Sequence, residues 1–457
     1  MDDPLEPPHA PGLPDPAAAP APGTPPGPPP AEDAEGAAPA AGRTTGPPAP
    51  DVSVVVGAFD AMPYLIRCLE SVESQTLGPD RIELLAVDDG STDGTGEYLE
   101  AFAARSAVRT TVVRQPNSGG PGGPRNRGLA LARGRYVFFL DADDFLGDEA
   151  LERMTAMADR AGTDVVLGRM AGRGRGVPRS MFTRTVERAD VRTSRVVYAL
   201  SAQKLFRREL LTRRGLTFDE SFATGEDALF TMEAYLAGRG VSVVADYDCY
   251  YLVGREDGKH ATRRGGHESR FAAVTALAVL IARLEPPGPG RDLLMVRPFT
   301  VGLLQQFSPA LLRRPEAEQR ERLRLAAPLT GPYWNRGVAA HLKVAERLVL
   351  ECVARGRLDL LSGVLEHIGS GAVPRVVRRR LTGRVYLALP YFGDRRSGLP
   401  ARTYRVTVPD RAGGARVLPG ADGRSRVREI AGAIRRRARR IGALRALRDA
   451  GIRMWNR

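Results

Sequence analysis

Residues 136–145 read YVFFLDADDF, a run of strand-forming side chains that stops on three aspartates. The apolar run 136–140 predicts a fully buried strand, because a short continuous apolar run is typical of a parallel sheet covered on both faces. Asp141, Asp143 and Asp144 then fall at the carboxyl end of this strand, the edge where open α/β sheets bind ligands. Clustered carboxylates repel one another, and oxygen ligands favour Mg²⁺ or Mn²⁺. The alternative is an acidic turn in which one aspartate caps the next helix.

The residues before this stretch alternate between predicted strands and helices. Strands are predicted at 52–56, 82–87 and 109–114, and helices from about 63 to 75, from about 96 to 104 and through 132. Alternation in units of about thirty residues predicts a parallel, Rossmann-like sheet. Right-handed crossovers then bring the loops after these strands to one edge of the sheet.

The composition limits the classes of partner. The 457 residues carry a net charge of +14, which favours an anionic partner: a nucleotide, a phosphate polymer, a membrane surface or a nucleic acid. Cys68, Cys249 and Cys352 have no metal-like spacing and are too few for a disulfide framework, which favours the cytoplasm. The apolar run 271–282 is too short to span a bilayer, and the first residues lack a signal-peptide pattern. We therefore expect a soluble or peripheral protein.

Four segments of different character divide the chain. Residues 1–50 are dominated by Pro, Ala and Gly and are expected to be a disordered tail. Residues 51–265 carry the α/β pattern, and 266–395 show amphipathic helical patterns typical of a small helical domain. The segment 396–457 ends in a basic amphipathic helix, predicted over 424–457. This helix could anchor the protein on an anionic membrane, contact a polyphosphate acceptor or simply be solvated.

Four motifs, taken in order, resemble those of the inverting family 2 glycosyltransferases of the GT-A fold. They are VSVVVGAFDAMPYLIRCLESVESQT (52–76), LLAVDDGSTDGT (84–95), the glycine-rich NSGGPGGPRN (117–126) and YVFFLDADD (136–144). The resemblance covers about residues 51–255 and implies a nucleotide-sugar donor, with UDP as its nucleotide, and Mn²⁺ or Mg²⁺ as cofactor. It implies donor-binding residues at the strand ends and in the glycine-rich loop: Phe59, Asp60, Asp88, Asp89, Asn117, Gly119, Arg125, Asn126 and Asp141.

The resemblance also implies a metal ligand and a general base. Asp143 matches the metal ligand of the family's Asp-X-Asp motif, and Asp141 matches its partner. In the later segment FATGED (222–227), Asp227 is the expected general base, with Glu226 positioning the acceptor or a loop. In an arbitrary sequence, such acids would simply stabilise a helix N-terminus. His260 could complete the metal shell, although an exposed histidine without a ligand is the plainer interpretation.

These features predict a metal-dependent inverting transferase that moves a sugar from a UDP-linked donor to a hydroxyl of a cell-wall or surface glycopolymer. The helical segment resembles the linker of wall-teichoic-acid glycosyltransferases, and it could hold an acceptor or build a homo-oligomer. The alternatives are transfer to a lipid-linked or exopolysaccharide acceptor, or a non-catalytic nucleotide-sugar-binding scaffold. Nucleic acid is not expected as a partner, because the basic segment lacks interleaved aromatic residues. The expected location is cytoplasmic, with the basic helix on the inner face of the plasma membrane.

Overall fold

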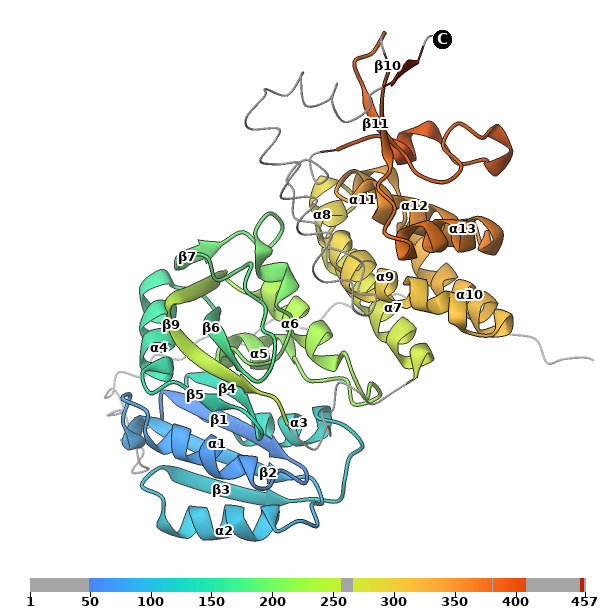
Figure 1. Ribbon diagram of the computed structural model, residues 1–457. Coiled ribbons are helices and arrows are strands. Elements are labelled where there is room, and N and C mark those ends of the chain that lie inside the picture. The colour runs from blue at the N-terminus through green and yellow to red at the C-terminus, as the bar shows by residue number, and fades with distance from the viewer. Residues whose placement is uncertain (1–48, 256–265, 380, 408–452, 456–457) are drawn as a thin grey trace, which may run out of the picture. The chain divides into compact units, whose positions relative to one another are not determined.

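The computed structural model describes residues 49–255, 266–379, 381–407 and the backbone of 453–455 (Figure 1). The predicted tail, His260 and most of the predicted basic helix therefore lie outside the described residues. Within the described ranges, no helix is both long and apolar enough to cross a membrane.

Nine strands form the main sheet. Eight follow the order β3-β2-β1-β4-β8-β6-β9-β5, and β7 pairs with β9. The strands are β1 (Val52–Ala58), β2 (Ile82–Asp88), β3 (Arg109–Arg114), β4 (Tyr136–Asp141), β5 (Phe145–Leu146), β6 (Val165–Arg173), β7 (Val186–Ala189), β8 (Leu205–Arg207) and β9 (Val241–Val253). Strands β1 to β4 are parallel to one another, which confirms the predicted Rossmann-like half. The short β8 then pairs antiparallel with both β4 and β6.

The register of the parallel strands decides which side chains meet at the sheet edge. Gly57 lies beside Asp141 on the β1–β4 pair, and Ala58 lies beside Asp88 on the β1–β2 pair. The ends of β1, β2 and β4 therefore lie level with one another. This arrangement confirms that their loops share one edge of the sheet.

Among the described residues of this α/β domain there are six α-helices, whose arrangement Figure 1 shows. They are α1 (Tyr64–Glu73), α2 (Thr95–Arg105), α3 (Gly122–Leu131), α4 (Ala150–Ala161), α5 (Arg208–Arg214) and α6 (Glu226–Ala237). Helix α3 lies close against β1, because a Cβ on Gly128 would come 2.4 Å from Val55 Cγ1. The glycine-rich stretch 117–126 is thus only partly a loop: its second half, with Arg125 and Asn126, is the start of α3.

The apolar runs 241–244 and 249–252 predict two short strands, but the structure has one long strand, β9. Its pairing with β6 shifts register between Gly168 and Met170, and the irregularity lets one strand continue through residues of mixed polarity. The aspartates Asp246 and Asp248, which interrupt the apolar pattern, lie on this strand.

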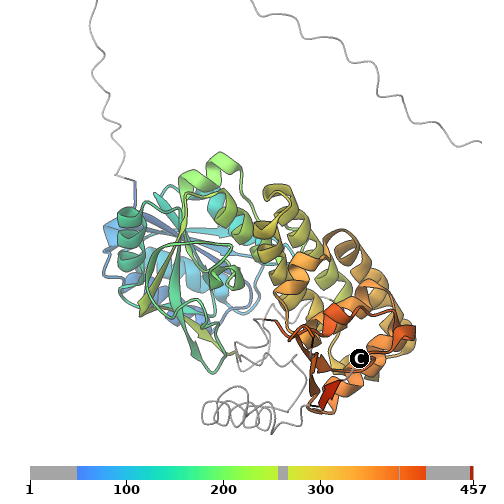
Figure 2. The ribbon, with the colours of Figure 1, turned by 90° about the horizontal axis from the view of Figure 1, so that it is seen from above.

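The segment after residue 266 is mainly helical, as predicted. Its helices are α7 (His267–Leu284), α8 (Pro289–Arg297), a π-helical turn (Pro298–Leu303), α9 (Leu304–Gln306), α10 (Glu316–Tyr333), α11 (Arg336–Ala340), α12 (Val344–Ala354) and α13 (Leu358–Gly369). They pack together (Figure 2) around fully buried side chains such as Phe299, Phe307, Leu348 and Leu361.

Two features near the end of the chain were not expected from the sequence. The predicted helical domain, 266–395, also contains an antiparallel hairpin of β10 (Arg375–Arg379) and β11 (Val385–Ala388), whose β-branched residues favour strands. The basic helix was expected to run to Arg457, but residues 453–455 form the short strand β12, which pairs with β10. Backbone pairing of this kind can override the apolar periodicity on which the helix prediction rested.

Candidate functional site

A cavity of about 500 Å³ lies at the carboxyl ends of β1 and β4. The strand ends, the glycine-rich stretch and the start of α6 all contribute to its wall. It brings together most of the predicted site residues: Phe59, Asp89, Asn117, Gly119, Arg125, Asp141, Asp143, Glu226 and Asp227. The described structure does not place Asp60, Asp88 or Asn126 in this wall.

The turn after β1 is clamped by the loop after β2. The Asp60 N–H donates to Ser91 Oγ at 3.0 Å, and its carboxylate accepts from the Thr92 N–H at 3.0 Å. Asp60 adopts a left-handed conformation with φ 45°, which aspartate tolerates because its carboxylate bonds locally. The clamp turns Asp60 into the loop and leaves the neighbouring Phe59 in the cavity wall.

The paired acids after β2 have different surroundings. The Asp89 carboxylate accepts from the Ser118 N–H at 3.1 Å and from Ser118 Oγ at 2.9 Å, and Asp89 lines the cavity. The Asp88 carboxylate accepts from the Ser91 N–H at 3.1 Å and pairs with Arg114 at 3.4 Å. Asp89 therefore remains a donor-site candidate, whereas the contacts of Asp88 hold the loop.

Asn126 holds the chain segment that leads to α6. Its amide nitrogen donates to the Phe218 carbonyl and its amide oxygen accepts from the Phe218 N–H, both at 2.8 Å. The Phe218 ring lies under the Arg125 guanidinium, 5.3 Å from its carbon. Asn126 thus supports Arg125 through Phe218, where the sequence had predicted a direct contact with the donor.

Three aspartates after β4 form a compact acidic cluster. One carboxylate oxygen from each of Asp141, Asp143 and Asp144 lies within 4.8 Å of the other two. Asp144 is buried and fixed to β9, because it accepts from the Tyr250 hydroxyl at 2.8 Å and from the Val253 N–H at 2.7 Å. Asp141 and Asp143 both reach the cavity.

The charge of this cluster is only partly compensated. Burial and the neighbouring Asp141 raise the pKa of Asp143 to about 6, and Arg255 and Arg175 oppose that rise. The pKa of the Asp144 carboxyl is raised well above its usual range, mainly by burial. A divalent cation would relieve this repulsion, and carboxylate oxygens are its usual ligands. The residues present therefore fit a hard divalent metal, with Asp143 as the cavity-facing ligand.

Arg125 links the acidic cluster to the expected base. Arg125 is 7% exposed, and its guanidinium donates to Asp141 Oδ1 at 2.8 Å and to Glu226 Oε1 at 2.9 Å. The two carboxylates hold the pKa of Arg125 above its ordinary value against the effect of burial. One buried cation therefore fixes the start of α6 against the end of β4.

Asp227 follows Glu226 in the first turn of α6 and lines the cavity. Burial raises the pKa of Asp227, and the positive charges of Arg125 and Lys204 oppose that rise. Burial and the charge of Asp227 raise the pKa of Glu226 to about 7. A carboxylate whose pKa is moved toward neutrality is suited to accept a proton.

Several side chains of this site were not predicted. The Gln203 amide donates to Asp141. The fully buried Lys204 amine donates to the Ser201 carbonyl, and burial lowers the pKa of Lys204 to about 7. Arg175 and Arg297 also line the cavity. Lys204 lies directly before β8, and nothing in the sequence indicates that its amine is buried beside Asp227.

Comparisons with known proteins agree with this geometry. Residues 53–235 match the family model "Glycosyl transferase family 2", and residues 267–365 match "Glycosyl transferase TarS linker domain". The poly(ribitol-phosphate) beta-glucosyltransferase of Bacillus spizizenii is 40% identical over 210 residues, covering 46% of this chain and 33% of the relative. The poly(ribitol-phosphate) beta-N-acetylglucosaminyltransferase TarS of Staphylococcus aureus is 38% identical over 230 residues, covering 50% of this chain and 40% of the relative. The chain thus spans less than half the length of these two relatives.

A solved structure is similar over both domains. The crystal structure of S. aureus TarS residues 1–349 in complex with UDP-GlcNAc superposes with a TM-score of 0.67 at 30% identity, covering 74% of this chain and 97% of that one. This similarity confirms the predicted GT-A-like sheet followed by a helical domain. With the two family models and the acidic cavity at the expected sheet edge, it shows that the chain belongs to glycosyl transferase family 2 and carries a TarS-type linker domain.

Proposed function

We propose that the protein transfers a sugar from a UDP-linked donor to a hydroxyl of a polyol-phosphate wall polymer, with inversion at the anomeric carbon. The observation that carries the proposal is the convergence of Asp89, Asp143 and Asp227 on one cavity. The names of the two relatives supply the acceptor class, and the TarS complex supplies UDP-GlcNAc as a donor bound by a related structure.

The cavity is suited to a nucleotide sugar. Its volume of about 500 Å³ lies within the range of about 300–1,000 Å³ that is usual for small-molecule sites. Phe59 offers an aromatic wall for the base, and Asp89 is an acceptor for hydroxyl or imino donors. Asn117 and Gly119, which line the cavity in the glycine-rich stretch, would contact the sugar or diphosphate.

The acidic cluster is the proposed metal site. Asp143 would bind Mn²⁺ or Mg²⁺ directly, and Asp141 would help through its remaining lone pairs, because Arg125 and Gln203 already orient its carboxylate. A divalent ion bound there supplies positive charge for the leaving diphosphate. Arg255 and Arg175, whose charges already act on Asp143, would add to that field.

Asp227 is the proposed general base. Its carboxylate takes the proton from the acceptor hydroxyl while the hydroxyl oxygen forms a bond to the anomeric carbon. The bond from that carbon to the donor's diphosphate oxygen breaks on the opposite face, and UDP leaves with the electron pair. A single displacement inverts the configuration and needs no carboxylate nucleophile. The positive charges of Arg125 and Lys204 favour the ionised form of Asp227 and oppose the rise in its pKa that burial causes.

Three earlier expectations stay predictions. They are the cytoplasmic location, the contact of the basic C-terminal segment with an anionic membrane, and assembly into a homo-oligomer. Completion of the metal shell by His260 also stays a prediction, since that residue lies outside the described ranges.

A thermal-shift titration tests the donor and metal assignments. UDP and a UDP-sugar should raise the Tm in Mn²⁺ and lose most of that effect in chelator, because a ligand of the native state stabilises it by mass action. Asp143→Asn should lose the metal-dependent part, whereas Asp88→Asn should bind UDP as the wild type does if it still folds. A well-folded protein with no shift for any UDP compound would contradict the proposal.

A further inference from the structure

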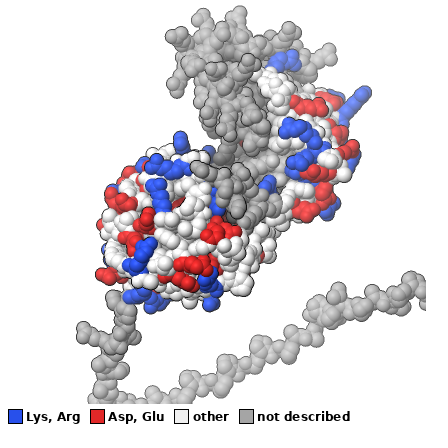
Figure 3. Space-filling view, turned by 60° about the horizontal axis from the view of Figure 1, so that its bottom comes forward, with Lys and Arg blue, Asp and Glu red and all other residues white. Residues whose placement is uncertain are grey.

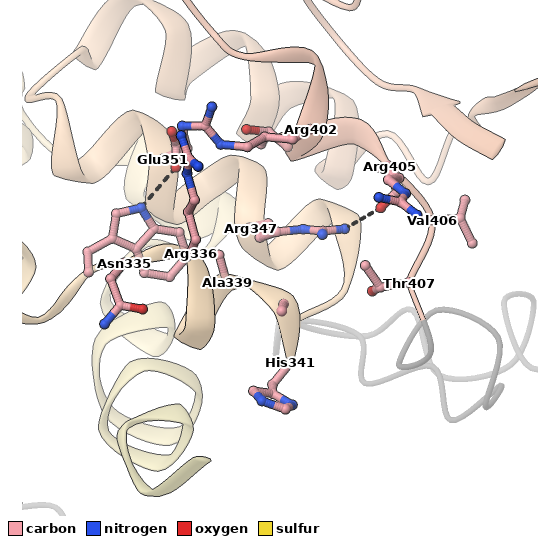
Figure 4. A pocket seen from close by; sticks show the side chains of 13 residues that line it. Asn335, Arg336, Ala339, His341, Arg347, Glu351, Arg402, Arg405, Val406 and Thr407 are labelled. Atoms are coloured by element: carbon pink, nitrogen blue, oxygen red, sulfur yellow. Dashed lines mark hydrogen bonds between the residues drawn. The ribbon is translucent and has the colours of Figure 1, made fainter. Parts of the chain in front are cut away.

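A second cavity, of about 1000 Å³, lies in the helical domain (Figure 4). We call it the arginine cavity, because four arginines line it: Arg336 on α11, Arg347 on α12, Arg402 in the 3-10 turn Ala401–Tyr404, and Arg405 just after that turn. Trp334 and Ala339 add apolar surface, and Asn335, His341 and Thr403 add polar groups. Arginines from four places in the chain therefore surround one space.

Glu351, the acidic residue in this wall, already has partners of its own. Glu351 accepts from the Trp334 indole N–H at 2.9 Å and pairs with Arg355 at 2.5 Å. Arg347 is 5% exposed and donates to the Arg405 carbonyl at 2.6 Å, as the dashed line in Figure 4 shows. Among the described residues, no carboxylate forms an ion pair with the exposed Arg336, Arg402 or Arg405.

Three other arginines of the same domain form ion pairs. Arg320, Arg324 and Arg357 each pair with a nearby acid on the surface, at 2.5 Å to 2.6 Å. Figure 3 likewise shows acidic and basic side chains interspersed over the described surface in view. In contrast to these three, Arg336, Arg402 and Arg405 have no acidic partner among the described residues and face one common space.

Helix α8 connects the arginine cavity to the cavity that contains Asp89, Asp143 and Asp227, which we call the sugar-transfer cavity. Asp292 in the first half of α8 accepts from the amide of Asn335 in the arginine cavity at 2.9 Å, and Arg297 at the end of α8 lines the sugar-transfer cavity. Asp292 and Arg297 are separated by less than two helical turns, or roughly 7 Å at 1.5 Å per residue. Helix α8 therefore has one residue bonded to the wall of the arginine cavity and another in the wall of the sugar-transfer cavity.

We propose that the arginine cavity binds phosphodiester groups of the polymer acceptor while a neighbouring repeat occupies the sugar-transfer cavity. This inference rests on the proposed function for the identity of the polymer. Guanidinium groups match phosphate oxygens in two-point geometry, and the Trp334 wall suits the carbon chain of a polyol. Arg402 and Arg405 lie beyond the matched linker model, which ends at residue 365, so the site is completed by a segment outside that model.

Binding of a labelled ribitol-phosphate oligomer of several repeats to the full chain, without donor, tests the inference independently of turnover. The triple variant Arg336→Gln, Arg402→Gln, Arg405→Gln should bind the oligomer at least about tenfold more weakly, because each exposed charge contact contributes a few-fold. Higher ionic strength should weaken the wild type more than the variant. UDP binding, followed by thermal shift, should be unchanged.

A matched control separates the cavity from net charge. Arg320→Gln, Arg324→Gln, Arg357→Gln removes the same number of charges from surface pairs of the same domain. This control should bind the oligomer within about twofold of the wild type, since exposed pairs and distant charges contribute little. Ala340→Glu places a carboxylate in the cavity wall without removing an arginine, and it should also weaken binding.

The outcomes separate this inference from the proposed function. Equal losses in the two triple variants, or equal oligomer affinity in the wild type and the cavity variants, would overturn the inference whether or not sugar transfer occurs. Cavity-dependent binding of anionic lipid vesicles without binding of the oligomer would overturn it in favour of a membrane site. If no UDP-sugar were used but the oligomer still bound through the cavity, the proposed function would fail while the phosphodiester site stood.

Discussion

Replacing Arg125 by glutamine removes the cation that joins the acidic cluster to the start of α6. The variant loses two charge-assisted contacts, at 2.8 Å to Asp141 and 2.9 Å to Glu226, made by a residue that is only 7% exposed. Loss of one partner from a buried ion pair costs about 3–5 kcal/mol, because the remaining charge stays buried without compensation. For roughly 350 described residues, an unfolding entropy of about 2.1 cal/mol/K per residue turns about 4 kcal/mol into a Tm drop of about 5 °C.

The loss of stability in the Arg125→Gln variant, called the deficit below, should depend on pH. In the wild type the pKa of Glu226 is about 7, raised by burial and by Asp227, and Arg125 opposes that rise. Without Arg125 the folded variant takes up a proton at higher pH than the folded wild type does. Protonation removes a charge that needed the arginine, so the deficit should be largest near pH 8 and smaller near pH 5.

Thermal denaturation at the two pH values measures the effect, with Arg160→Gln as the matched control. Arg160 pairs with Glu187 at 3.0 Å on the surface of the same domain, with 56% and 61% of the two side chains exposed. An exposed pair contributes about 0–1 kcal/mol, which predicts a Tm change of about 1 °C. A Tm drop for Arg125→Gln no larger than that of the control would contradict the stabilising role of Arg125. A loss of stability that grows as the pH falls would contradict the role of its pairing with ionised Glu226.

Three further substitutions test the roles of single groups in the sugar-transfer cavity. Asp143→Asn should abolish Mn²⁺-dependent binding of UDP, measured by calorimetry; unchanged metal dependence would remove it as a ligand. Asp227→Asn should keep donor binding and lower turnover by roughly two to four orders of magnitude, the range for a lost general base; near-normal turnover would exclude that role. Lys204→Met should raise the pKa of Asp227, because a positive charge that favours its ionised form is lost. The acidic limb of the kcat profile should then move to higher pH, whereas a merely structural defect would lower the rate equally at every pH.

Much of the fold could be predicted because its signals are local. Strands β1, β2, β3 and β4 are short runs of strand-forming residues bounded by helices, and their parallel pairing follows from that alternation. The carboxylates after β2 and β4 and at the start of α6 reach one cavity for the same reason. By contrast, the β10–β11 hairpin depends on pairing between segments whose individual patterns are weak.

The site could be predicted less completely, because the partners of a polar side chain depend on packing. The motif DDGST indicated two donor-binding aspartates, yet the contacts of Asp88 hold a loop while Asp89 faces the cavity. Asn126 stands beside Arg125 in sequence, but one helical position turns its amide toward the Phe218 backbone. Gln203 and Lys204 come directly before β8, whose antiparallel placement between β4 and β6 has no signature in the sequence.

The most direct test of the central claim is sugar transfer itself, with the anomeric configuration of the product read by NMR. Purified protein is incubated with Mn²⁺, poly(ribitol-phosphate) and α-linked UDP-GlcNAc or UDP-glucose, and Asp227→Asn serves as the matched control. We expect a β-linked product that requires the metal and is nearly absent with the variant. An α-linked product, equal transfer by the variant, or no transfer from any UDP-sugar by a folded protein would contradict it.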